Sequence, residues 1–160
     1  MAKRHRIFLK IRLRPSQLRT VAQRRFADAE ALRDTGENER ANGTMYLAGF
    51  VIECLLKAKL LERFAWLQSA SSPAGRTKNE AHVWSLCYRS HNLDEILALL
   101  PNLSQRLLNA ERRGQLRLLE SLKSVCAHWT IFARYSPYAA MMSEADEFLT
   151  RVKELKEWLK

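Results

Sequence analysis

Apolar residues recur at intervals of three and four along nearly the whole chain after residue 14, and this period restricts the fold more than any other feature of the sequence. Such spacing places apolar side chains along one face of an α-helix. No run of alternating β-branched residues follows residue 15, so a β-sheet has no support. We therefore predict a single all-α domain over residues 15–160, built as an up-and-down bundle of four to five helices.

Residues that favour helix ends divide this stretch into elements. Pro15 and Ser16 begin a first helix that Gly36 ends, and a longer helix is predicted over 40–68. Residues 69–80 have the composition of an exposed loop. The remaining predictions are a short helix that Asn92 caps and Pro101 stops, a helix from Ser104 to about Arg113 with a break at Gly114, a helical stretch over 118–133 that Ser136-Pro137 ends, and a last helix over 144–160 that Ser143 caps.

Positive charge is concentrated at the N-terminus. Of the 27 Lys and Arg residues, nine lie within residues 1–27, which contain no acid, and the rest of the chain carries eighteen bases against 17 acids. We expect residues 1–14 to form a basic arm that contacts nucleic-acid phosphates. A solvated tail is the alternative, and the alternation of apolar residues over 7–13 is also compatible with a short strand. The proposed phosphate contacts are Arg4, Arg6, Lys10, Arg12 and Arg14.

Several classes of protein are excluded by what the sequence lacks. The three cysteines are far apart and form no Cys-x-x-Cys pair, which indicates a reduced, cytoplasmic setting. No apolar run approaches the roughly 20 residues of a membrane helix, so we expect no membrane association. The five glycines form no phosphate-binding loop, and we predict no cofactor. We also predict no metal, because the spacing of His82, Cys87 and His91 does not match a zinc finger.

Glu53 is the only charged residue in the apolar stretch 45–56, and a buried carboxylate requires a partner. Lys57 follows four residues later, in the favourable order for an ion pair within one helix. Alternatively, Tyr46 and Lys57 line a polar pocket with Glu53, and a cation such as Arg134 reaches it from another helix. Both interpretations remain open at this stage.

A second polar cluster lies over residues 126–135. If the helix continues through it, His128 and Tyr135 share one face, because seven residues make nearly two turns, whereas Arg134 points elsewhere. A solvated face is the commoner explanation of such a stripe. His91, just before the Asn92 cap, is likewise more often a turn or packing histidine than a catalytic one.

Three segments, in this order, resemble the HEPN (higher eukaryotes and prokaryotes nucleotide-binding) family: residues 46–58, residues 91–97, and Trp129 followed by Arg134-Tyr135. The resemblance spans residues 17 to about 157. It implies an all-helical bundle, frequent homodimerisation and a role with RNA or nucleotides. It also implies a toxin-antitoxin or defence context, because many members are metal-independent ribonuclease toxins paired with a nucleotidyltransferase antitoxin.

The family's ribonuclease signature is an Arg followed four to six residues later by a His, and the segment after Arg134 offers no such His. The one pair with that spacing, Arg76 and His82, falls in the predicted loop region and matches a frequency expected by chance. Our first hypothesis is therefore a dimeric module that binds RNA, a nucleotide or a nucleotidyltransferase partner. Its predicted binding residues are Tyr46, Lys57, Trp129 and Tyr135.

Two other functions stay open. In the first, the chain is a metal-independent endoribonuclease with an altered motif: Arg134 stabilises the phosphate, His128 or His91 is the general acid or base, and Glu53 orients the arginine. In the second, the chain is a protein-interaction subunit without affinity for nucleic acid.

Overall fold

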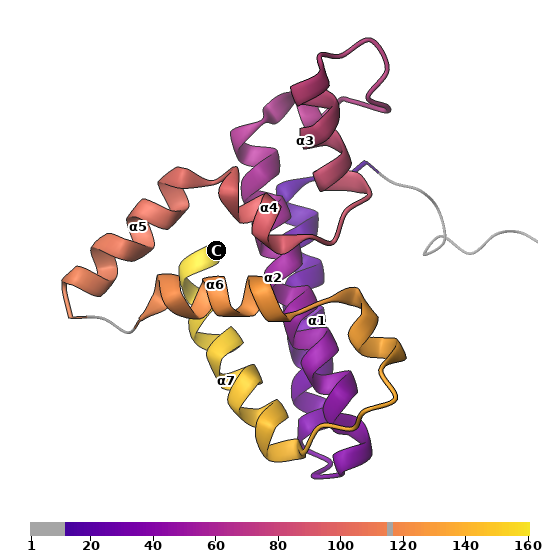
Figure 1. Cartoon of the computed structure of the whole chain (residues 1–160), viewed down its shortest axis with the longest axis vertical. Helices are drawn as coiled ribbons and strands as arrows, with labels where there is room; N and C mark the ends of the chain where they lie inside the picture. The colour runs from indigo at the N-terminus through magenta and orange to yellow at the C-terminus, as the bar shows by residue number, and fades with distance from the viewer. Residues whose placement is uncertain (1–11, 115–116) are drawn as a thin grey trace, which may run out of the picture.

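A computed structural model describes residues 12–114 and 117–160 of the chain (Figure 1). No strand occurs within these two ranges, and the predicted all-α bundle is confirmed, although the described residues form seven α-helices where four to five were predicted. The α-helices are α1 (Pro15–Arg33), α2 (Ala41–Arg63), α3 (Lys78–Tyr88), α4 (Leu93–Ala98), α5 (Pro101–Arg112), α6 (Leu118–His128) and α7 (Met142–Leu159). Short 3₁₀ segments are η2 (Asn38–Arg40), η3 (Ala65–Gln68) and η4 (Ile131–Tyr135). Residues 1–11 of the predicted arm, with Arg4, Arg6 and Lys10, lie outside the described residues.

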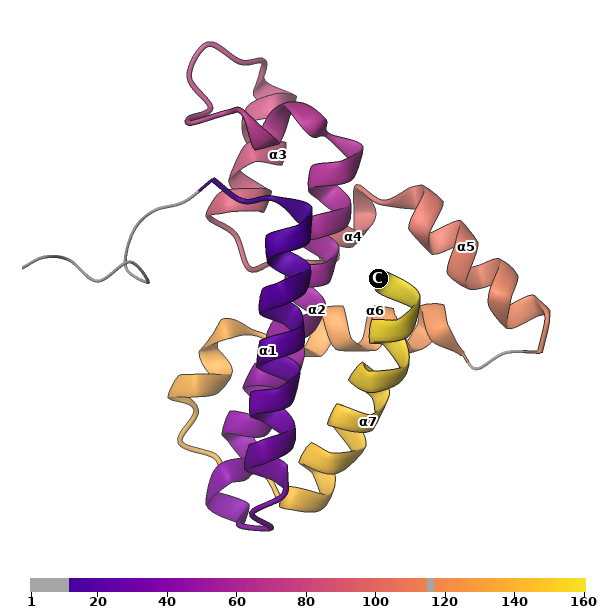
Figure 2. The same ribbon diagram turned by 180° about the vertical axis from the view of Figure 1, so that it is seen from behind.

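The central helix is α2, which is buried continuously from Val51 to Ala58. The chain reverses after α1 at Gly36, whose φ of 69° suits glycine, so α1 lies alongside α2 along the long axis of the molecule (Figure 2). Helix α7 packs against another side of α2, and α6 crosses them (Figure 1). The predicted periods account for this packing, because α1 buries Leu18, Ala22, Phe26 and Ala29, and α7 buries Ala145, Leu149, Val152, Leu155 and Leu159.

Helix α3 and the end of α2 differ from the prediction. The long helix over 40–68 is interrupted after Arg63, and η3 follows. The predicted loop over 69–80 gives way to α3 at Lys78, where Thr77 forms a capping box. The Thr77 side chain accepts from the Glu80 N–H at 3.3 Å, and the Glu80 carboxylate accepts from the Thr77 N–H at 3.1 Å. This Thr-x-x-Glu signal was present in the sequence.

Two other predicted helix starts are displaced. Pro101 begins α5 instead of only ending α4, because proline at the first helical position loses no hydrogen bond, so Ser104 is inside the helix and does not cap it. Helix α7 begins at Met142, and Ser143 is its second residue. The Asn92 cap of α4 is confirmed by its bond from the Glu95 N–H. Gly114 ends α5 with a φ of 79°.

Gly49 positions the segment after α6. A Cβ added at Gly49 would overlap the ring of Trp129, and the Trp129 indole Nε1 donates to the Tyr46 carbonyl at 3.1 Å. The indole therefore lies directly on the α2 backbone and anchors the start of η4. None of the helices in the described part of the chain is both long enough and apolar enough to span a membrane.

Candidate functional site

Glu53 belongs to a buried polar network. Its side chain is 3% exposed, and the Lys57 Nζ donates to its Oε1 at 2.7 Å. The same Nζ donates to the Ser90 carbonyl at 2.8 Å. The predicted ion pair within α2 is therefore confirmed, and Lys57 also holds the loop between α3 and α4 against α2.

His91 completes this network from that loop. Its Nδ1 lies 3.0 Å from both carboxylate oxygens of Glu53. An ionised carboxylate can only accept, so Nδ1 carries the hydrogen of this contact, and in the neutral ring Nε2 is then the acceptor, on a side chain that is 37% exposed. A buried carboxylate thus fixes the orientation of a partly exposed imidazole, which is the arrangement that general-base chemistry requires.

Arg134 does not join Glu53. Its guanidinium lies 5.9 Å from the centroid of the Tyr46 ring and 4.8 Å from that of the Tyr135 ring, and Glu53 forms its ion pairs with Lys57 and His91. Tyr46 precedes Glu53 by seven residues, about 10 Å along α2. The predicted pocket in which Arg134 supplies the cation for Glu53 is therefore wrong, because Lys57 already supplies it and Arg134 stacks on aromatic rings two turns away.

The predicted helical stretch over 118–133 is also wrong, since α6 ends at His128. Trp129 has an extended backbone, with φ of −75° and ψ of 130°, and η4 then runs in a new direction. His128 and Tyr135 consequently do not share a helix face. The break therefore comes at ψ of Trp129, directly after the residue whose indole packs on Gly49 of α2.

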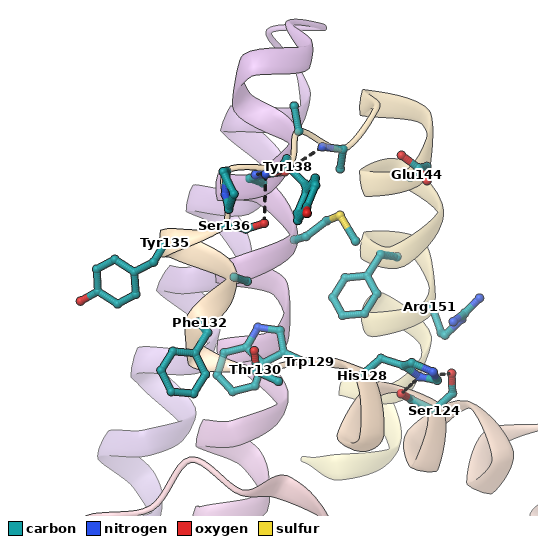
Figure 3. A pocket seen from close by; sticks show the side chains of 17 residues that line it. Ser124, His128, Trp129, Thr130, Phe132, Tyr135, Ser136, Tyr138, Glu144 and Arg151 are labelled. Carbon is teal, nitrogen blue, oxygen red and sulfur yellow. Dashed lines mark hydrogen bonds between the residues drawn. The ribbon is translucent and has the colours of Figure 1, made fainter.

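A pocket of about 820 Å³ opens between this redirected segment and α7 (Figure 3). Met45, Trp129 and Phe148 are apolar parts of its lining. Polar groups come from Ser124 and His128 on α6, Thr130, Ser136 and Tyr138 around η4, and Glu144 and Arg151 on α7. Figure 3 shows His128 next to Ser124 at one end of the pocket and Glu144 towards the other.

Side chains before and within α2 hold one wall of the pocket in place. The Asn42 amide donates to the Tyr138 carbonyl at 2.6 Å and accepts from the Ala140 N–H at 2.9 Å. The Asn38 side chain accepts from the Met142 N–H at 2.8 Å. The extended segment 136–141 is thereby fixed to the helical body, so the pocket is already formed without a ligand.

His128 has a defined orientation at the rim. Its Nδ1 donates to the Ser124 carbonyl at 2.7 Å, a bond drawn in Figure 3. Because a carbonyl can only accept, Nδ1 carries the hydrogen, and in the neutral ring Nε2 is again the acceptor nitrogen. The two predicted catalytic histidines, His91 and His128, thus both donate through Nδ1, but they belong to different parts of the structure.

Exposed aromatic rings border the pocket. Phe132 is 72% exposed, Tyr135 69% and Tyr138 82%. Tyr135 points away from the pocket on the outer side of η4, where Arg134 stacks on it (Figure 3). Phe132 and Tyr138 were not among the predicted binding residues; the density of aromatic residues over 129–138 was the signal that could have identified them.

The predicted binding residues therefore separate into different environments. Tyr46 and Trp129 stack on each other with centroids 6.0 Å apart and serve as packing residues under η4. Lys57 is buried in its ion pair, whereas Tyr135 is exposed. Arg12 and Arg14 are exposed just before α1.

The cysteines are buried, and burial raises the pKa of Cys54 and of Cys126 to about 12 and that of Cys87 to about 11. No group of three His, Cys, Asp or Glu side chains in residues 12–114 and 117–160 is placed to hold a metal ion. Comparison with known proteins gives no match to a family model, a curated protein or a solved structure.

Proposed function

We propose that this chain is a HEPN-like module that binds single-stranded RNA or nucleotides at the pocket between η4 and α7. One observation carries the proposal: a preformed pocket with apolar lining and a polar rim lies beside exposed aromatic rings in a protein of net charge +10. Bases stack on aromatic rings irrespective of sequence, and a positive protein attracts the phosphate backbone.

The two parts of this surface have separate tasks. Phe132 and Tyr135 on η4 offer exposed faces for stacking, and Arg134, which already stacks on Tyr135, adds a cation beside them. The pocket accepts one base or nucleotide, with polar groups at its rim. Because Asn42 holds the pocket wall in place, little conformational entropy is lost on binding.

Binding of a fluorescently labelled 12-nucleotide RNA, measured by anisotropy at low salt, tests this proposal. Tyr135→Ala removes one stacking face, and we expect an affinity loss of about 5- to 150-fold, which corresponds to about 1–3 kcal/mol per base. Two control variants should bind within about twofold of the unmodified protein. Tyr135→Phe keeps the ring at this position, and Trp66→Ala removes a ring from η3, which is 69 residues before Tyr135 in the sequence. Wild-type affinity in Tyr135→Ala would contradict the proposal.

A homodimer and a nucleotidyltransferase partner belong to the same proposal, through the resemblance to the HEPN family, within a toxin-antitoxin or defence system. Light scattering of the purified protein tests the dimer. Co-purification with the product of an adjacent nucleotidyltransferase gene tests the partner.

A metal-independent endoribonuclease is a second candidate, favoured by the contact between His91 and Glu53. In this reaction the ribose 2′-oxygen attacks the adjacent phosphorus while its proton passes to an imidazole Nε2. The bond from phosphorus to the 5′-oxygen breaks, and the 5′-oxygen takes a proton from the imidazolium formed in the first half of the step or from water. The phosphate role predicted for Arg134 does not combine with the pair of His91 and Glu53, because Arg134 lies beside Tyr46, about two turns of α2 from Glu53.

Labelled RNA incubated with the protein in EDTA separates the candidates. Cleavage to 2′,3′-cyclic phosphate ends that is lost in His91→Gln or His128→Gln, and kept in His82→Gln, supports the nuclease. Intact RNA that is nevertheless retained supports the binding module. Intact RNA without retention supports a protein-interaction subunit.

A further inference from the structure

We infer that the pocket between η4 and α7 selects a guanine base, carried either by a free nucleotide or by single-stranded RNA; this rests on the proposed function. Glu144, Phe148 and Arg151 all line the pocket from α7. Their spacing of four and then three residues puts them on one face of the helix. Glu144 and Phe148 therefore give this wall a carboxylate beside an aromatic ring, and the Arg151 side chain reaches the edge of the pocket, where its guanidinium lies on the outer side of α7 (Figure 3).

The Glu144 carboxylate is fixed in position. Its Oε2 accepts from the Met141 N–H at 2.7 Å at the start of α7, while Oε1 makes no hydrogen bond within the described part of the chain. An ionised carboxylate accepts and never donates. This end of the pocket therefore suits a ligand edge with hydrogen-bond donors and disfavours one with lone pairs.

Guanine meets this requirement better than the other bases. Its Watson–Crick edge has two neighbouring donors, N1–H and the N2 amino group. Adenine and cytosine place a ring nitrogen lone pair next to their single amino group, and uracil places its N–H between two carbonyls. A carboxylate facing any of these three meets an acceptor next to the donor, which is repulsive.

Arg151 suits the adjoining edge of guanine. Its Nη2 donates to Glu147 Oε1 at 3.2 Å, and a guanidinium has five N–H donors, so others remain for a ligand. Arginine pairs bidentately with the O6 and N7 acceptors of guanine. Glu144 and Arg151 are seven residues apart, which places their backbones about 10 Å apart along the helix, with Phe148 between them.

His128 is compatible with this orientation. It lies at the rim next to Ser124 (Figure 3), and its Nε2 is an acceptor. A ribose hydroxyl can donate to that nitrogen while the base occupies the pocket. The histidine therefore binds the sugar without favouring a particular base.

Competition binding with GMP, AMP, CMP and UMP tests the inference, together with uridine octamers that contain either one guanosine or none. We expect GMP, or the octamer with guanosine, to bind about 5- to 150-fold more tightly than its counterparts. Tighter binding of GMP than of the other three nucleotides identifies a free nucleotide as the ligand. A preference for guanosine that appears only among the octamers identifies RNA as the ligand. Glu144→Gln should abolish the preference while the other bases still bind. Glu154→Gln, an exposed acid elsewhere on α7, is the matched control and should keep it.

The outcomes separate this inference from the proposed function. Equal binding of all four bases, or a guanine preference that survives in both Glu144→Gln and Arg151→Gln, overturns the guanine inference and leaves RNA or nucleotide binding intact. If Tyr135→Ala loses all binding and the unmodified protein shows no base preference, the guanine inference is likewise overturned and RNA or nucleotide binding still stands. No binding of any nucleotide or octamer overturns both. Circular dichroism of each variant shows that it is folded.

Discussion

The ion pair between Glu53 and Lys57 makes the sharpest prediction about stability. Glu53→Leu leaves the Lys57 ammonium buried, with only the Ser90 carbonyl as partner. The His91 Nδ1–H also loses its acceptor, although that side chain is exposed enough for water to replace it. The damage therefore comes mainly from an uncompensated buried charge.

Removing one partner of a buried ion pair costs about 3–5 kcal/mol. We expect about 3 kcal/mol here, the lower end of that range, because the Lys57 Nζ keeps its bond to Ser90. For a chain of this length the loss corresponds to a melting temperature lower by about 6–12 °C. In Glu53→Leu with Lys57→Met, two apolar side chains replace the pair, and we expect the free energy of unfolding to return to within about 1.5 kcal/mol of the unmodified protein.

Urea denaturation followed by circular dichroism measures the free energy of unfolding of the two single variants and the double variant. Glu154→Leu removes an exposed acid from α7 and should change it by less than about 0.5 kcal/mol. The reasoning is refuted if Glu53→Leu loses less than about 1 kcal/mol, or if the double variant loses the sum of the two single losses. Additivity would mean that the two side chains do not depend on each other.

Three other predictions concern the core, the thiols and the arm. Gly49→Ala should lower the free energy of unfolding by about 1–3 kcal/mol, because the added Cβ would overlap Trp129. Gly43→Ala should be close to neutral, because the nearest atom to its added Cβ is the movable Leu32 Cδ1 at 3.1 Å. Thermal melts of the two variants measure this difference. The buried cysteines should not react with a thiol reagent at pH 8 until the chain unfolds. Because burial raises the pKa of Cys54 from 9.0 to about 12, unfolded thiols ionise first and stability should fall as pH rises from 9 to 12, less steeply in Cys54→Ala; an unchanged slope would refute this. Deleting residues 1–14 should lower the slope of log affinity for RNA against log salt by up to about 3.5, for five phosphate contacts; an unchanged slope would show that the arm does not contact RNA.

Local signals predicted much of the fold. The apolar period and Pro15 predicted α1, and the period over 148–159 predicted most of α7. The Asn92 cap involves neighbouring residues only, and it was predicted correctly. The start of α3 was missed although Thr77 and Glu80 carry a local capping signal.

Contacts between distant segments were not predictable in the same way. The Glu53 partner at Lys57 is one helical turn away and follows from spacing, whereas its partner His91 is 38 residues away and depends on how the loop after α3 packs on α2. A contact between Arg134 and Glu53 likewise depends on how two distant segments pack together. The apolar period of the sequence gave no information about the distance between Arg134 and Glu53.

The end of α6 shows the same limit at the candidate site. Residues 118–133 have a helical period, yet the chain leaves the helix at Trp129, the residue whose indole packs on Gly49, 80 residues earlier. That break forms the pocket with α7 and exposes Phe132 and Tyr135. Helical period and capping depend on residues that are close in the sequence, so the sequence by itself determines them. A pocket between segments depends on packing energies that exist only once those segments meet, and the tertiary structure alone decides them.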